Sequence, residues 1–291
     1  LGLRQAPSPA SIRRVLTSAE PALLCSLNTA GDLAVLIVDG NAARGSRTPT
    51  TQAAHLLAAM TPAGHVAVQV RVADKASEIA ALKDALAGVG ITGCLVSADA
   101  LHTQADTEKY LAGERRAHYL FTVKANQPTL FAQVKALPWA QAPVLHTEGD
   151  RGHGRAEVRT TKVLTATGIA FPHAVQALRV HRWVREAATG KVTRTYAYLV
   201  TSLSAEQAGA HRLARLVRCH WRIEALHHIR DVSFGEDTSR VRTGHGPLNM
   251  AMLRNLAIPI LAGLGHASIP EAYRWVGYEC FTRPLDLLGL P

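Results

Sequence analysis

The order in which short apolar runs and helical repeats follow one another constrains the fold of this chain more than any other feature of its sequence. Three apolar runs of strand length come first, at Leu33–Val38, His55–Met60 and Val66–Val72. The link between the second and third, Thr-Pro-Ala-Gly at 61–64, has the composition of a tight turn and predicts a hairpin.

The chain then alternates between helix and strand. Residues 76–87 repeat their apolar positions with helical spacing, and a further helix is expected at about 103–112 and another from Gln127. Short strands are predicted between them at Cys94–Val96 and Tyr119–Val123. Helical links of this kind join parallel strands, so the whole segment predicts a mixed α/β sheet flanked by helices. This is the layout of the ribonuclease H-like fold.

A β-rich segment follows at 146–203, with strands expected at 158–163, 177–183 and 193–200. We interpret it as an all-β insertion that precedes a long helix at 205–230. The predicted division of the chain is a helical N-terminal segment at 1–30, the first part of the core at 31–145, the insertion at 146–203, and a helical C-terminal part at 204–291. Within these parts we expect a helix at 11–27 capped by Ser11, an apolar helix at 248–264, and an irregular tail from Tyr273.

The charge of the chain points to a polyanionic partner. It has 32 Lys and Arg against 22 Asp and Glu, a net charge of +10, and neutralised phosphates release counterions on binding. Charge alone leaves DNA, RNA and acidic membranes open. The longest apolar stretch, 256–264, is far shorter than the roughly 20 residues that span a bilayer, and nothing marks the chain for secretion. A cytoplasmic location is therefore expected, and the first residue, Leu1, suggests a fragment.

Two aspartates are the first candidates for chemistry. Asp39 and Asp99 each follow a predicted buried strand. If these strands are parallel neighbours, the two carboxylates meet at the same edge of the sheet, where ligands of open α/β sheets bind. Carboxylates placed so close together repel unless a cation lies between them, and ligands with oxygen alone favour Mg²⁺ or Mn²⁺. The alternative is that each aspartate only forms a turn or caps a helix.

A third carboxylate is expected from the helix at 205–230. Glu224 borders the apolar face set by Ile223 and Leu226, and Asp231 returns to nearly the same face two turns later. The other interpretation is that these are solvated charges on a helix surface.

Basic residues accompany these carboxylates, as expected where phosphates approach bound metals. Within Arg151-Gly152-His153-Gly154-Arg155, glycines and guanidinium groups could follow a phosphate backbone, or the segment could be an ordinary hairpin turn. Trp183 is either a base-stacking residue or part of the core. The candidate DNA contacts are Arg44, Lys124, Arg151, His153, Arg155, Arg222 and Arg230.

Five blocks of sequence, in this order, resemble one family. They are Val38-Asp39-Gly40 with Arg44-Gly45-Ser46, residues 97–104 (SADALHTQ), residues 123–128 (VKANQP), residues 152–155 (GHGR), and residues 220–237 from His-Trp-Arg-Ile-Glu to Glu-Asp. The family is the DDE transposases of bacterial insertion sequences, in particular the As-one group of the insertion-sequence-four superfamily. The resemblance extends over nearly the whole chain.

The resemblance implies that Asp39 and Asp99 are the first two catalytic carboxylates and Glu224 the last. It implies a transposase that holds two Mg²⁺ or Mn²⁺ ions and uses them to cleave and transfer DNA strands at the ends of an insertion sequence. The expected partner is double-stranded DNA with terminal inverted repeats, bound by a homodimer, with no membrane involved. The chain has Asn41-Ala42, Ala225 and His228 where the family usually has Lys-Thr, Asn and Trp.

Two other interpretations are open. A catalytically decayed remnant would bind the DNA ends and inhibit transposition by an intact enzyme. A zinc hydrolase would use His220, Glu224 and His227, although their spacing is not that of the HExxH motif.

Overall fold

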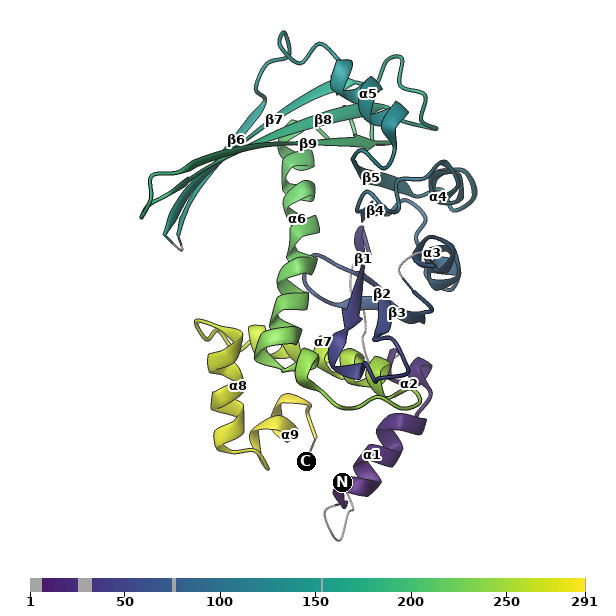
Figure 1. The fold of residues 1–291 in the computed structure, drawn as a ribbon, viewed down its shortest axis with the longest axis vertical. Coiled ribbons are helices and arrows are strands. Elements are labelled where there is room, and N and C mark those ends of the chain that lie inside the picture. Colours follow the sequence, from purple (N-terminus) through teal and green to yellow (C-terminus); the bar gives the residue numbers. More distant parts are fainter. Residues whose placement is uncertain (1–6, 26–32, 75–76, 153, 291) are drawn as a thin grey trace. The chain divides into compact units, whose positions relative to one another are not determined.

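A mixed sheet of nine strands is the central feature of the computed structural model, with strand order β3-β2-β1-β4-β5-β9-β8-β7-β6 (Figure 1). The structure describes residues 7–25, 33–74, 77–152 and 154–290. These form two compact units. Unit 1 contains Leu1–Leu33, Asp39–Val89 and Arg222–Pro291, and unit 2 contains Ala34–Val38 and Gly90–Trp221. Each unit is described by itself below.

The parallel part of the sheet belongs to unit 2. Val35–Val38 of β1 (Val35–Ala43) pair in parallel with β4 (Leu95–Ala98), which pairs in parallel with β5 (His118–Val123). These strands are buried on both faces, which explains their continuous apolar runs. Helical segments follow β4 and β5, namely α4 (Ala105–Glu108) with a π turn at Lys109–Glu114, and α5 (Pro128–Ala136). The predicted parallel crossover from β4 to β5 is confirmed, whereas α5 leads into the antiparallel β-rich segment.

The β-rich segment is a meander of four antiparallel strands in unit 2. Its strands are β6 (His146–Gly152), β7 (Arg155–Thr165), β8 (Gln176–Glu186) and β9 (Val192–Thr201). β9 also pairs antiparallel with β5, from Leu120↔Thr201 to Val123↔Tyr198. The segment predicted as an insertion thus continues the central sheet through backbone hydrogen bonds.

The first part of helix α6 (Ala210–His228), up to Trp221, belongs to unit 2 and packs against the meander. Its apolar residues Leu213, Leu216 and Val217 are buried against strand residues such as Leu178 and Leu199. Fully burying an apolar side chain of this size stabilises the fold by about 1.5–3 kcal/mol. The packing fixes which face of α6 is turned to the sheet, and with it the direction of the polar residues that follow.

Unit 1 contains the predicted hairpin, β2 (Ala54–Met60) with β3 (Val66–Val72), and α3 (Glu78–Ala87). Unit 1 also contains the long helix α7 (Gly246–Ala262) and the shorter helices α1 (Pro9–Ser18), α2 (Pro21–Cys25), α8 (Ile269–Tyr278) and α9 (Arg283–Leu287). Two 3-10 turns lie at Arg44–Ser46 and Glu236–Thr238. A small core joins β2 to α7 through Leu56, Leu248 and Met252. No described helix is long and apolar enough to cross a membrane.

Three local predictions are wrong. Strand β1 does not end at Asp39 but runs on to Ala43. The first helix is capped by Ser8 instead of Ser11, because the Ser8 hydroxyl accepts the Ser11 backbone N–H at 3.1 Å. The tail is not irregular from Tyr273, since α8 extends to Tyr278 and α9 follows.

Candidate active site

Asp39 lies within β1 in unit 1, half-buried with 26% of its side chain exposed. One carboxylate oxygen, Oδ1, accepts the backbone N–H of Gly40 at 2.9 Å. The other, Oδ2, is 3.6 Å from Nδ1 of His227 on α6. A Cβ at Gly40 would collide with the carboxylate of Glu78, so a larger residue at this position requires the Glu78 side chain to move. The local backbone therefore fixes the direction of the Asp39 side chain.

His227 does not supply a positive charge to Asp39. Burial, and to a lesser degree the nearby Arg230 guanidinium, lower the pKa of this imidazole to about 3. Its second ring nitrogen, Nε2, is buried and has no hydrogen-bond partner among the described residues. The side chain beside Asp39 is thus a neutral imidazole at pH 7, and the Asp39 charge is not offset by it.

Asp99 lies in unit 2, directly after the last residue of β4. Its Oδ1 accepts the backbone N–H of Leu101 at 2.9 Å. The Thr103 hydroxyl donates to the carbonyl oxygens of Asp99 at 3.2 Å and Thr122 at 2.7 Å. The Asn126 amide donates to the Ala100 carbonyl at 2.6 Å. These bonds hold the turn that carries Asp99 and leave its Oδ2 without a hydrogen bond from any described residue.

These hydrogen bonds come from residues of two of the sequence blocks, 97–104 and 123–128. Thr103 and Asn126 are neither acidic nor basic, and nothing in the charge pattern marked them. They connect the segment after β4 to the segment after β5, with a further bond from Gln127 to Gln104 at 2.8 Å. Their role in this structure is to fix the Asp99 turn.

His220 on α6 is the second residue near Asp99. Its Nδ1 is 3.1 Å from the hydroxyl of Ser97 on β4. Burial lowers the pKa of His220, while the negative charge of Asp99 opposes that shift. From the sequence, His220 was a candidate zinc ligand and the first residue of the block at 220–237.

Helix α6 carries Glu224 on the face that both histidines share. Residues 220, 224 and 227 are spaced by four and three positions, which places them on one side of a helix. Within unit 2 this face meets Ser97 through His220, and within unit 1 it meets Asp39 through His227. Glu224 itself is exposed. The two histidines direct Nδ1 to different partners, which does not match ligands of a single zinc ion.

Each aspartate comes directly after the paired part of its strand, Asp39 within β1 and Asp99 after the end of β4. The last registered pair of β1 and β4 is Val38↔Ala98, and Asp39 and Asp99 are the next residues of each strand. Among the described residues, no three His, Cys, Asp or Glu side chains converge closely enough to hold a metal ion as they stand. The donor chemistry of the two aspartates and Glu224, carboxylate oxygen alone, fits Mg²⁺ or Mn²⁺.

Four of the predicted DNA contacts are exposed. Arg44 has 79% of its side chain exposed and lies 3.7 Å from Asp237 in unit 1. In unit 2, Lys124 is exposed just after β5, and Arg151 and Arg155 are exposed at the hairpin between β6 and β7. His153 and the side chain of Arg222 lie outside the described residues.

The structure contradicts the prediction that Arg230 contacts DNA. Its side chain is buried, and its guanidinium group donates to both carboxylate oxygens of Glu236 and to Asn255. Arg254 donates to the same carboxylate at 3.2 Å. A buried cation with these partners is not available to a DNA phosphate, so Arg230 holds the segment after α6 in place instead. Sequence alone did not distinguish it from its exposed neighbours on the helix.

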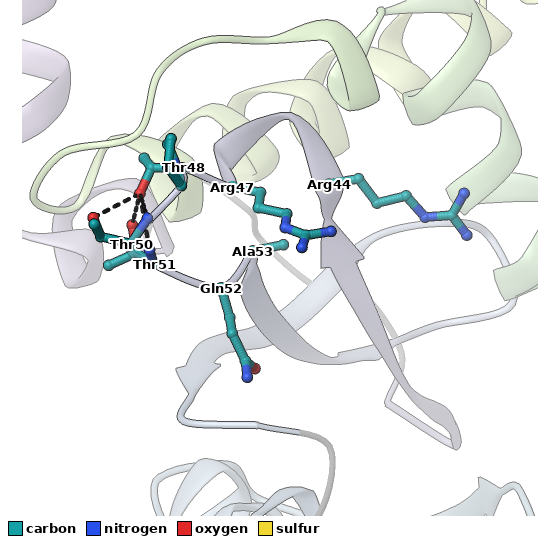
Figure 2. Close-up of a pocket in the computed structure, with 8 residues that line it drawn as sticks. Arg44, Arg47, Thr48, Thr50, Thr51, Gln52 and Ala53 are labelled. Atoms are coloured by element: carbon teal, nitrogen blue, oxygen red, sulfur yellow. Dashed lines mark hydrogen bonds between the residues drawn. The ribbon is translucent and has the colours of Figure 1, made fainter.

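The Arg44-Gly45-Ser46 block packs against Glu236–Thr238 in unit 1. A Cβ at Gly45 would lie 2.8 Å from the carbonyl oxygens of Glu236 and Asp237, so the approach needs glycine. Beside it, Arg44, Arg47 and residues 48–53 line an open hollow (Figure 2). Figure 2 shows the Thr48 hydroxyl bonded to Thr50 and Thr51, which closes the loop on itself. Sequence analysis did not identify this threonine cluster.

Comparison with known proteins gives a consistent result. The family description "Transposase DDE domain" matches residues 30–259. YbfL of Escherichia coli K12 is 26% identical, with 86% of this chain and 72% of YbfL aligned. YncI of Escherichia coli O157:H7, a candidate transposase, is 27% identical, with 78% of this chain and 61% of YncI aligned. The chain therefore spans only part of the length of these relatives.

A solved structure of a piggyBac transposase synaptic complex with hairpin DNA is also similar, with a TM-score of 0.46 and 12% sequence identity. The match covers 92% of this chain and 58% of that one. This likeness is too weak to add to the family match.

Proposed function

The chain belongs to the transposase DDE domain family, and from that premise we propose that it cleaves and transfers DNA strands at the ends of an insertion sequence, with Asp39, Asp99 and Glu224 as its catalytic residues. These three side chains would bind two divalent cations, Mg²⁺ or Mn²⁺. Bound ions of this kind activate water or a 3′ hydroxyl and stabilise charge on the phosphate under attack.

One observation carries the proposal. Asp39 and Asp99 follow a registered pair of parallel strands, and α6 reaches Asp39 through His227 and Ser97 through His220, with Glu224 between the two histidines on the same face. Asp39 thus lies beside the helix that carries Glu224 within unit 1, and Asp99 follows β4 within unit 2. These observations support the proposal that the three carboxylates bind the ions together. Since Glu224 is exposed, it is accessible to an incoming ion.

The residues around the carboxylates support the same chemistry. His227 is neutral at pH 7 and so does not place a positive charge beside Asp39 that would compete with a bound cation. The hydrogen bonds from Leu101 and Thr103 orient Asp99 before any ion binds, and such orientation lowers the cost of assembling the site. The exposed cations Arg44, Lys124, Arg151 and Arg155 would bind DNA phosphates, with His153 and Arg222 as further contacts.

The proposed substrate is double-stranded DNA that carries terminal inverted repeats, and the proposed assembly on it is a homodimer. The As-one group of the insertion-sequence-four superfamily is the proposed subgroup, on the sequence blocks given above. The other candidate is a remnant that binds DNA ends without cleaving them, which the substitutions at Asn41-Ala42, Ala225 and His228 favour.

The test is a nicking assay with purified protein, Mn²⁺ or Mg²⁺, and linear DNA that bears the ends of the element. We expect Asp99→Asn and Glu224→Gln to reduce nicking by about 1000-fold, because metal ligands supply several kcal/mol of transition-state stabilisation. Glu114→Gln, at an exposed carboxylate in unit 2, is the matched control and should nick normally. Binding without nicking by the unsubstituted chain would support the remnant instead.

A further inference from the structure

The meander β6–β9 separates its charges between two faces. Side chains alternate across a strand, and the unbroken registers of these four strands fix which residues share a side. One face is turned to α6, and it carries every acidic residue of the four strands, Glu148, Asp150, Glu157 and Glu186. The opposite face, which we call the cationic face, comprises Arg151, Lys162, Arg179, His181, Trp183, Arg185, Arg194 and Tyr196.

Part of the cationic face is covered within unit 2. The segment after α5 lies over it, and Lys162 donates from Nζ to the Trp139 carbonyl oxygen at 2.8 Å. The Arg179 guanidinium lies 5.4 Å from the centre of the Trp139 ring. Figure 1 shows α5 and α6 on opposite sides of β8 and β9. Beyond Arg179, toward the end of the meander, Arg185, Arg194 and Tyr196 are exposed, while His181 and Trp183 are half-buried.

Aromatic rings occupy the uncovered part. Tyr196 is 56% exposed, and the His181 ring is stacked on it with centroids 4.8 Å apart and an interplanar angle of 24°. The Arg179 guanidinium lies 5.3 Å from the Tyr196 centroid. Trp183 follows on the same side of β8, opposite Arg194 of β9. These contacts hold the Tyr196 ring in place while leaving it accessible.

The arginines of the uncovered part are not neutralised. Arg151, Arg185 and Arg194 are exposed, and their side chains form no ion pair or hydrogen bond with any residue that the structure describes. The α6 face differs, since Glu157 there contacts Arg159 and Arg182. Positive charge is thus paired on one side of the sheet and unpaired on the other, which fits a polyanion as the partner of the cationic face.

From this we infer that the cationic face binds single-stranded DNA, with bases stacked on Tyr196 and Trp183 and phosphates at Arg151, Arg185 and Arg194. Aromatic rings interleaved with cations suit unpaired bases, whereas a duplex keeps its base faces stacked inside and would leave Tyr196 without a contact. The inference rests on the proposed function in that the bound strand would be unpaired DNA beside a cleaved end.

The test measures the affinity of the full chain for a fluorescein-labelled oligothymidine of about 16 nucleotides, by fluorescence anisotropy in EDTA so that no cleavage occurs. Tyr196→Ala should weaken binding by about 5- to 100-fold, the effect of losing one stacked base. Tyr196→Phe, which keeps the ring, should bind as the unsubstituted chain does. Arg194→Ala should reduce the slope of log affinity against log salt by about 0.7.

Two controls match these variants. Thr195→Ala changes the exposed neighbour of Tyr196 on the α6 side of β9, and Lys109→Ala removes an exposed charge elsewhere in unit 2. Both should retain single-strand affinity. The inference is overturned if Tyr196→Ala binds single strands normally, or if it weakens binding to a duplex of the same length as much as to the single strand. If the unsubstituted chain does not nick DNA in the assay above but Tyr196→Ala still weakens single-strand binding, the proposed function is wrong and the inference about the cationic face stands.

Discussion

The surroundings of Asp39 in unit 1 contain buried ion pairs, whereas the turn that carries Asp99 in unit 2 is held by hydrogen bonds from backbone and side-chain N–H and O–H groups. Behind Asp39 lie the neutral His227 and then Arg230, which with Arg254 contacts the buried carboxylate of Glu236. Asp99 is held by the Leu101 N–H and by the Thr103 hydroxyl. Buried charges respond to pH and to the loss of a partner far more than hydrogen bonds from neutral donors do. Different changes should therefore destabilise the two regions.

The largest expected effect is on the buried ion pairs. Glu236→Gln would leave Arg230 and Arg254 buried without a counter-charge and should lower the free energy of unfolding by about 3–5 kcal/mol, measured by urea denaturation. Glu279→Gln is the matched control, because Glu279 also pairs with an arginine, Arg283, but is exposed, and it should change stability by less than about 1 kcal/mol. If both variants lower the free energy of unfolding equally, the buried ion pairs are no more sensitive to the loss of a charge than an exposed one.

The second largest effect is expected on the stability of the fold in acid, through His227. Unfolded histidine takes up a proton near pH 6.5, while folded His227 does so only near pH 3. Between these values the unfolded state binds one more proton, so stability should fall by up to about 1.4 kcal/mol for each unit that the pH is lowered. Denaturation series between about pH 6 and 4, in EDTA, should show a smaller slope for His227→Asn. Identical slopes would mean that His227 titrates normally in the folded chain.

A smaller effect is expected for the hydrogen bonds around Asp99. Thr103→Val keeps the shape of a fully buried side chain but removes its donor, and should cost about 1–3 kcal/mol. Thr107 is equally buried, and its hydroxyl has no hydrogen-bond partner among the described residues. Thr107→Val should therefore leave the free energy of unfolding unchanged or raise it. If Thr107→Val loses as much stability as Thr103→Val, the loss comes from the changed side-chain shape and not from the missing hydrogen bond.

The smallest effect on stability is expected at Arg44, whose pair with Asp237 is mostly exposed. Arg44→Ala should change the free energy of unfolding by less than about 1 kcal/mol. If Arg44 contacts a phosphate, the same variant should reduce the salt slope of duplex binding by about 1. An unchanged slope in an anisotropy titration would exclude that contact.

Much of the sheet was predictable because its strands are locally apolar. The hairpin β2–β3, α3 and β5 follow directly from apolar spacing and turn residues. Strand β6 was missed, since its sequence His-Thr-Glu-Gly-Asp-Arg-Gly is polar and forms a strand only through pairing with β7. Helix α8 carried a readable signal, the cap Ser268 with Glu271 three residues later.

The site was predictable only in part. Asp39 and Asp99 were chosen because each follows a buried apolar run, and each comes directly after a member of the registered pair Val38↔Ala98. The burial of Arg230 was not readable, because its partner Asn255 comes from α7, 25 residues further along the chain. Helical spacing identifies the face of a residue but not what another segment places against it.

The most direct test of the account counts Mn²⁺ bound to the full chain in complex with end DNA, by electron paramagnetic resonance. We predict about two ions per protomer, with a loss in Asp39→Asn, Asp99→Asn and Glu224→Gln but not in Glu114→Gln. If the three variants bind as many ions as the unsubstituted chain, these carboxylates do not hold the metal and the proposed chemistry is contradicted.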